Sequence, residues 1–248
     1  MEKYKVNSIH NEGPFLITGC YRKLCNTLES LKVGKGKIVH VIGAPGTGKS
    51  ANIFYALNNM DLNVYDVKFG LKSARASSKH VFNALFEEIG KDLQVKSKDE
   101  IYKKLSEYDV VLIADSFHDS HDLSPNYVGF SKWTNQAGFK ALYFYLLCMN
   151  EYIKNRNYFK NINIILQTAW RVHIKGKKYD IFSDFGLFSR ILVNMLKIFF
   201  DVVEISYSEE ETINIVKMHI KDASEDSIKQ CIQKYGFKPR FICDALEK

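Results

Sequence analysis

The sequence of 248 residues predicts an α/β fold: a three-layer core with a mostly parallel sheet, followed by a small helical domain at the C-terminus. Three observations predict it. Short apolar runs typical of buried strands alternate with helix-like segments over residues 1–206. A glycine-rich loop joins one of these strands directly to a helix. From residue 207 onward, the pattern changes to short helices with their own start and stop signals.

The glycine-rich loop has the spacing of a phosphate-binding loop. It lies between an apolar strand at 37–42 and a helix that begins near Lys49. Glycines let backbone amides turn inward around phosphates, and the N-terminus of a helix favours negative charge. Lys49 is therefore expected to reach the β- and γ-phosphates of ATP, and the Ser50 hydroxyl to bind Mg²⁺. The predicted nucleotide-binding residues of the loop are Gly43, Ala44, Pro45, Gly46, Thr47, Gly48, Lys49 and Ser50.

A second apolar run, 109–115, ends in an acid that can hold the metal. The carboxyl ends of the strands in a doubly wound sheet form the ligand site, so Asp115 is expected beside Ser50. There its carboxylate would orient Mg²⁺ through a water molecule. The alternative is an acid that only ends the strand in a turn.

The general base is less clear, because Ser116 stands where a glutamate would activate water. Either another acid does so or hydrolysis is slow. Asp66, in the strand-like run 62–67, and Asp119 are the two candidates. The latter belongs to a His/Asp cluster that could instead bind zinc or manganese, but a polar loop beside a Mg²⁺ site is the favoured interpretation. The cluster comprises His118, Asp119, His121 and Asp122.

A third strand, 162–166, is followed by the polar pair Gln167 and Thr168. Polar side chains at the carboxyl end of a buried strand can reach the γ-phosphate or its attacking water. With the two earlier strand ends, they complete a nucleotide crevice.

The succession of these segments resembles the AAA+ branch of P-loop ATPases, in particular its archaeal initiator-like and signalling ATPases. The resemblance covers nearly the whole chain in order and spacing, and the phosphate loop is its specific motif. The segments that carry it are 43–50, 110–115, 164–168, 188–191 and 235–240.

The resemblance implies roles for residues outside the loop. Gln167 or Thr168 would be the first sensor of the nucleotide. Arg190 would be an arginine finger, unless it is an ordinary exposed helix arginine. Arg240 would be a second sensor, unless it is a solvated charge in the helical turn after Pro239. The predicted catalytic residues are Lys49, Asp115, Thr168, Arg190 and Asp66.

The chain is expected to divide near Ser206 into an ATPase core at 1–206, with an N-terminal appendage at 1–36, and a lid domain at 207–248. In the appendage, the segment 15–19 is strand-like, and it can line the adenine pocket together with a helix that follows it.

Helix signals define the lid. Ser208 and Ser224 have the spacing of N-caps, Gly236 stops the second helix, and Pro239 suits the first turn of a third.

Basic residues point to a polyanionic partner. The formal net charge is +7, and the stretch from 152 to 179 has no acidic residue. Within it, 171–178 reads as a hairpin that turns at Gly176. Tyr127 and Trp133 could stack on bases. The alternative is a solvated charged face with core aromatics. The residues predicted to bind DNA or RNA are Arg171, Lys175, Lys177 and Lys178.

Composition favours a cytoplasmic protein. With 46% hydrophobic and 25% charged residues, the chain is typical of globular domains, and no apolar run is long enough to span a bilayer. The first residues lack the apolar segment of a signal peptide, and the five cysteines form no CxxC pair.

Three function classes remain open. The first is an AAA+-like ATPase that acts on DNA or RNA and forms a homo-oligomer with ATP, so that Arg190 reaches a neighbour's nucleotide. The second is a slow nucleotide-dependent switch, which Ser116 favours. The third is a RecA-like ATPase, suggested by Ile17–Cys20 and by the Asp115-Ser116 pair and opposed by the tail with Arg240.

Overall fold

A computed structural model describes residues 13–67, 71, 73, 75–113, 125–128, 139–174 and 177–247. The strands are β1 (Ile38–Ile42), β2 (Val64–Asp66), β3 (Val111–Ile113), β4 (Asn163–Thr168), β5 (Arg171–Ile174), β6 (Lys177–Asp180) and β7 (Asp201–Glu204). The helices of the first half are α1 (Gly19–Glu29), η2 (Ser30–Lys32), α2 (Lys49–Asn58), α3 (Ser78–Leu93), α4 (Lys98–Glu107) and α5 (Pro125–Val128). Those of the second half are α6 (Phe139–Lys154), α7 (Arg156–Phe159), α8 (Leu187–Phe199), α9 (Glu209–His219), α10 (Glu225–Tyr235) and α11 (Pro239–Leu246).

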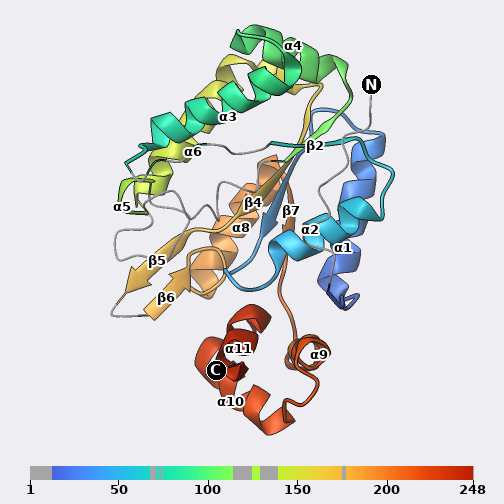
Figure 1. Ribbon diagram of the computed structural model, residues 1–248, viewed down its shortest axis with the longest axis vertical. Coiled ribbons are helices and arrows are strands. Elements are labelled where there is room, and N and C mark those ends of the chain that lie inside the picture. Colours follow the sequence, from blue (N-terminus) through green and yellow to red (C-terminus); the bar gives the residue numbers. More distant parts are fainter. Residues whose placement is uncertain are drawn as a thin grey trace.

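The central sheet has five strands in the order β2-β3-β4-β1-β7, and every pairing in it is parallel. It follows that β4 lies between the strand before the phosphate loop and the strand before Asp115. The register aligns Ile42 with Thr168, so these two strands end side by side. This parallel sheet with flanking helices confirms the predicted α/β fold class (Figure 1).

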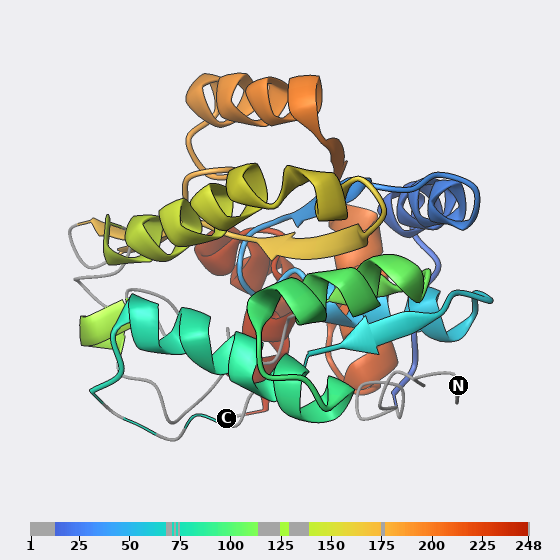
Figure 2. The same cartoon turned by 90° about the horizontal axis from the view of Figure 1, so that it is seen from above.

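Alternating apolar side chains bury both faces of the sheet. Val39, Val41 and Ile165 face one way and pack with α1 and α2 in one cluster. Ile42 faces the other way and packs with Val193 of α8. Strand residues two positions apart point to the same face of the sheet. Each short strand therefore packs apolar side chains against the helices on both faces. Seen from above, helices cover the sheet on both sides (Figure 2).

The prediction of a strand at 15–19 is wrong. The Thr18 hydroxyl accepts a hydrogen bond from the backbone N–H of Tyr21 and is the N-cap of α1, which begins at Gly19. A threonine is favourable in a strand and also at a helix start. Here the cap hydrogen bond decides between the two, and the helix begins earlier than predicted.

The three C-terminal helices begin at the predicted residues, and α10 also ends at the predicted glycine. Ser208 forms a capping box at α9, Ser224 caps α10, and Pro239 is the first residue of α11. Gly236 ends α10 with φ 71°, a conformation that favours glycine. The helices share a small core and lie beyond the edge where the sheet strands end (Figure 1). Their division from the core as a lid domain stays a prediction.

Within the described residues, no helix is both long enough and apolar enough to span a bilayer.

Candidate nucleotide-binding site

The loop between β1 and α2 has the backbone that a phosphate cradle requires. Gly46 and Gly48 have φ 89° and 76°, in the left-handed region that favours glycine. At Gly43 a Cβ atom would lie 2.8 Å from the carbonyl oxygen of Ile205 and 2.9 Å from the Thr47 hydroxyl. A side chain at position 43 would collide with these atoms, so the close packing of the loop requires glycine there. This chain's residues fit a polyphosphate at this place.

Lys49 is the first residue of α2, and its side chain is buried against the loop. Its Nζ donates to the carbonyl oxygens of Gly43 at 2.8 Å and Ala44 at 3.3 Å. A buried ammonium group requires such acceptors, because desolvation of an unpaired charge is costly. A phosphate entering the loop would have to replace them as the acceptor for Lys49.

Gln167 and Thr168 lie on opposite faces of β4. The Gln167 Nε2 donates to the Ser50 Oγ at 3.0 Å, on the face covered by α2. The Thr168 Oγ1 is instead 2.9 Å from the Nδ1 of His40, on the face covered by α8. Of the predicted sensor pair, Gln167 is therefore the residue that contacts the phosphate loop.

His40 explains why Thr168 is held on the face of the sheet that α8 covers. Its ring lies 4.8 Å from the ring of Phe200, and burial lowers its pKa to about 4. The imidazole is therefore neutral at physiological pH. A neutral histidine bonded to Thr168 fixes that threonine away from Ser50.

The predicted acids are only partly within the described residues. Asp66 ends β2, which lies at the sheet edge with β3 and β4 between it and β1. Neighbouring strands are ~4.8 Å apart, so its backbone is roughly 14 Å from that of β1. Asp115 and Ser116, and the cluster from His118 to Asp122, lie outside the described residues. Elsewhere, across the part of the chain that is described, no group of three His, Cys, Asp or Glu could hold a metal ion.

The C-terminal helices contact the loop directly. The backbone N–H of Arg240 donates to the carbonyl oxygen of Gly46 at 3.2 Å, and a Cβ on that glycine would lie 3.3 Å from the Phe241 ring. Nearer the core, Asn52 of α2 donates to the Tyr207 hydroxyl at 2.9 Å. The Arg240 side chain is exposed. The start of α11 therefore lies against the loop, where a guanidinium group could reach a bound phosphate.

Arg190 lies in the first turn of α8, and its side chain is exposed. The neighbouring Ser189 fixes this turn, since its hydroxyl donates to the carbonyl oxygen of Ile181 at 2.6 Å and accepts from the N–H of Phe185. Exposed apolar side chains surround Arg190 and continue along the helix: Leu187, Phe188, Ile191, Met195, Ile198 and Phe199.

The basic segment forms the expected hairpin. Strands β5 and β6 pair antiparallel, with Arg171 opposite Asp180 and Ile174 opposite Lys177. In Figure 1 they project from the end of β4 beside the C-terminal helices. The predicted turn residue and Lys175 lie outside the described residues, as do the side chains of the other basic residues of the hairpin.

Sequence reasoning missed Asp180, the last residue of β6. It is fully buried, and its two carboxylate oxygens accept hydrogen bonds from the N–H of Trp170 and the hydroxyl of Ser183. Burial raises its pKa to about 6, although the N–H of Trp170 and the ammonium group of Lys49 oppose that rise. The one signal in the sequence was an acid two positions after the basic pair Lys177 and Lys178.

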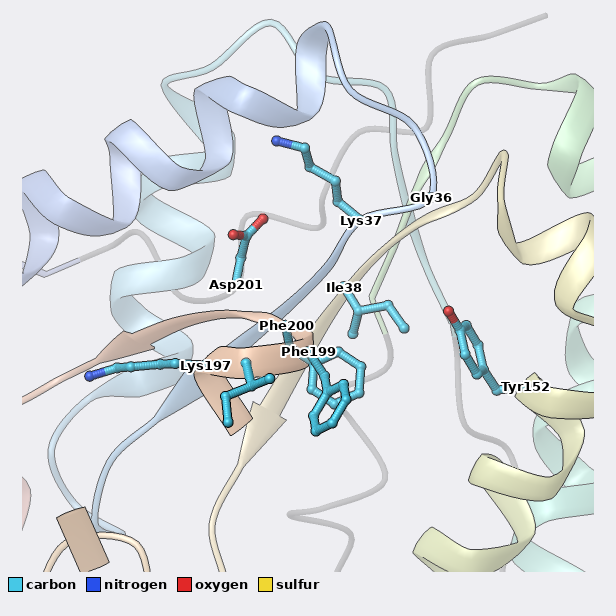
Figure 3. A pocket seen from close by; sticks show the side chains of 9 residues that line it. Gly36, Lys37, Ile38, Tyr152, Lys197, Phe199, Phe200 and Asp201 are labelled. Atoms are coloured by element: carbon cyan, nitrogen blue, oxygen red, sulfur yellow. The ribbon is translucent and has the colours of Figure 1, made fainter. Parts of the chain in front are cut away.

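A groove lies away from this site, at the opposite end of β1. It encloses about 310 Å³ between the end of α8 and Tyr152 of α6 (Figure 3). Lys37, Phe199 and Phe200 also line it. Its described lining includes none of the predicted nucleotide-site residues.

Neither protein-family models nor curated protein sequences match this chain. Solved structures of AAA+ ATPases are similar to it over most of its length, at low identity. A Walker-type ATPase of Pyrococcus abyssi is 15% identical with a TM-score of 0.48, and the match covers 96% of this chain and 69% of that one. A DNA replication initiation factor is 14% identical with a TM-score of 0.48, and the match covers 98% of this chain and 64% of that one. The replication initiator DnaA, in a structure bound to AMPPCP and single-stranded DNA, is 14% identical with a TM-score of 0.42. That match covers 94% of this chain and 62% of the other. The chain thus spans roughly two thirds of the length of these proteins.

Proposed function

We propose that this chain is a Mg²⁺-dependent ATPase of the AAA+ type. The observation that carries the proposal is the glycine cradle, with Lys49 across it and Ser50 at the start of α2. A glycine loop followed by a helix N-terminus suits a triphosphate, because such a loop can offer backbone amides and the Lys49 ammonium group to phosphate oxygens.

The residues around the loop suggest how each would act. Lys49 would exchange its carbonyl acceptors for phosphate oxygens, and Ser50 and Asp115 would hold Mg²⁺. The metal would neutralise charge on the β- and γ-phosphates. Gln167, already bonded to Ser50, would orient that hydroxyl and sense the γ-phosphate. With Ser116 after the metal-binding acid, we expect slow hydrolysis. Asp66 and Asp119 are the two candidate bases, and Asp66 lies on the edge strand, which two strands separate from β1.

Equilibrium binding tests the site. Wild-type protein should bind a fluorescent ATP analogue in the presence of Mg²⁺, and Lys49→Ala should weaken that binding at least about a hundredfold, since a buried charge-assisted contact is lost. Lys221→Ala removes an exposed lysine of the tail and is the matched control. Equal affinity of Lys49→Ala and the control would contradict the assignment.

We further propose that ATP turnover is coupled to DNA or RNA through the β5–β6 hairpin. Its four basic residues would contact phosphates, and the hairpin would lie near the proposed nucleotide crevice because β5 follows β4 directly in the chain. Single- or double-stranded DNA should then raise turnover, and the stimulation should fall steeply with salt. If DNA neither binds at low salt nor stimulates turnover, the slow nucleotide switch becomes the better reading. The contact between Arg240 and Gly46 favours that second function, because it joins the tail to the loop.

Self-assembly would complete the site. Arg190 is exposed within an apolar helix face, which suits an arginine that enters a neighbour's site. Arg190→Ala should reduce turnover while leaving ATP affinity nearly unchanged. Mixing it with Lys49→Ala should restore turnover, because one subunit supplies the loop and the other the arginine. Mixtures as inactive as the separate variants would exclude a role in trans.

A further inference from the structure

An ion pair joins the turn between β6 and α8 to the start of α11. The Nζ of Lys238, the residue just before α11, donates to the Oδ2 of Asp184 at 3.2 Å. The two side chains are only 17% and 20% exposed. In contrast, the pair of Lys229 and Glu225 within α10 is 44% and 49% exposed. Solvent therefore screens the attraction between Lys238 and Asp184 less than it screens the exposed pair.

The Asp184 carboxylate is held in one orientation by its own turn. Its Oδ2 also accepts from the backbone N–H of Asp180 at 2.8 Å, and its Oδ1 accepts from the Ser183 hydroxyl at 3.2 Å. The backbone N–H of Asp184 in turn donates to the carbonyl oxygen of Asp180 at 2.9 Å. A carboxylate that is already ordered by these contacts loses little further freedom when it binds Lys238.

The first turn of α11 lies directly against the phosphate loop. The backbone N–H of Arg240 donates to the carbonyl oxygen of Gly46 at 3.2 Å. The ring of Phe241 lies so close that a Cβ atom on Gly46 would be 3.3 Å from it. Arg240 follows Lys238 by two residues, so the ion pair and the loop contact act on the same helical turn. The position of this turn therefore decides which part of the loop the exposed Arg240 side chain can reach.

Separate contacts hold the beginning of the tail. The Tyr207 hydroxyl accepts from Asn52 of α2 at 2.9 Å, and the Oε1 of Glu211 in α9 accepts from the backbone N–H of Gly19 at 3.2 Å. Neither contact includes a residue of α11. Loss of the Lys238 ion pair should therefore loosen the first turn of α11 and leave α9 in place.

We propose that Lys238 and Asp184 are positioning residues, whose ion pair holds the first turn of α11 against the phosphate loop and so keeps Arg240 beside a bound triphosphate. This inference rests on the proposed nucleotide site, which it deepens. Without the pair, the turn can move away from Gly46, and the guanidinium group moves away from the phosphates with it. The pair also connects this turn to the base of the β5–β6 hairpin, because Asp184 is bonded to the last residue of β6.

Hydrogen exchange measured by NMR tests the contact without any nucleotide. An amide in the first turn of a helix lacks the usual acceptor four residues earlier, so protection of the Arg240 N–H reports its bond to Gly46. Lys238→Met should speed this exchange by about fivefold or more, and adding Asp184→Asn should speed it no further. Protection in α9 should stay as in the wild type.

The matched control for hydrogen exchange is Lys229→Met, which breaks the exposed ion pair within α10. It removes the same charge from the same group of helices and should leave the exchange of Arg240 unchanged. An Arg240 amide that exchanges in Lys238→Met at the wild-type rate would overturn the proposal.

Nucleotide affinity tests whether the ion pair acts through Arg240. Lys238→Met should weaken MgATP binding by about fivefold or more, the lower end of measured couplings between sites. Lys238→Arg keeps the charge and should bind nearly as the wild type does. In the Arg240→Ala background, Lys238→Met should cause no further loss. A residue with only a structural role would weaken binding equally in both backgrounds, so equal losses overturn the proposal.

The failure of this proposal is distinguishable from that of the nucleotide site. If the wild-type protein binds no MgATP, the proposed function fails, and the role of the pair toward a triphosphate fails with it. Hydrogen exchange then still decides whether the pair holds α11 on the loop. If MgATP binds and Lys238→Met has wild-type affinity, the positioning role alone fails. If Asp184→Asn does not fold, Lys238→Met carries both tests, because it leaves the hydrogen bonds of the Asp184 turn intact.

Discussion

Helices α2 and α8 are both rich in apolar residues, yet the structure treats them in opposite ways. In α2 the apolar residues Ile53, Phe54, Ala56 and Leu57 are all buried. In α8, which is described in full, the buried residues are Ser189 and Val193, and large apolar side chains face outward. An apolar pattern thus predicts that a helix has an apolar face, but it does not indicate which part of the protein covers that face.

The difference follows from the layers. α2 packs against α1 on one face of the sheet, and its apolar residues join the core cluster that both helices share with the strands. α8 covers the opposite face near the sheet edge, and its outer side has no such neighbour in the described part of the chain. The helix that begins in the phosphate loop is therefore fixed by the core, while the helix that carries Arg190 is available for contact.

Replacing a buried residue of α2 should have the largest effect on stability. Ile53→Ala should lower the free energy of unfolding by about 2–5 kcal/mol, because a fully buried isoleucine leaves a cavity. Ile198→Ala, the same change in α8 at 73% exposure, is the control and should stay within about 0.5 kcal/mol of wild type. Urea unfolding of both variants measures the contrast. Similar losses at the two sites would show that α8 is covered in solution.

A pH series tests whether the layer between the sheet and α8 is dry. Burial lowers the pKa of His40 to about 4, so the unfolded chain binds more protons than the folded one between that value and pH ~6.5. Stability should therefore fall by about 1–2 kcal/mol between pH 7 and pH 5.

The control is His40→Gln, which should remove that part of the slope. Asp180, whose pKa is raised to about 6, contributes a slope of the opposite sign, in which stability rises as pH falls. It contributes equally to both proteins, so the difference between the two curves isolates His40. Parallel curves would mean that water reaches the imidazole.

The smallest effect on stability is expected at the outer face of α8. Met195→Gln should change the unfolding free energy by about 0.5 kcal/mol or less, because the side chain is already half exposed. It should nevertheless reduce ATP-dependent self-association in sedimentation velocity, because the apolar contact area shrinks. Unaltered association would place the contact surface elsewhere.

Local signals account for most of what the sequence predicts correctly. The glycine loop between β1 and α2 and the helix starts at Ser208, Ser224 and Pro239 depend on neighbouring residues, so spacing alone defines them. The prediction of a strand at 15–19 was wrong because a threonine such as Thr18 is favourable both in a strand and as a helix N-cap.

Contacts between distant segments could not be predicted in the same way. Gln167 and Thr168 were equivalent until the face of each was known, and that depends on where β4 lies against β1. Asp180 reaches the backbone N–H of Trp170 only because β6 pairs with β5. No spacing in the chain encodes that contact.

The central claim is that the loop around Lys49 receives a triphosphate. The most direct measurement is a crystal structure with Mg²⁺ and a non-hydrolysable ATP analogue. We predict that the Nζ of Lys49 leaves the carbonyl oxygens of Gly43 and Ala44 for the phosphates, while Ser50 turns from Gln167 to the metal. Nucleotide bound in the groove beside Tyr152, with Lys49 still on its own loop, would contradict the account.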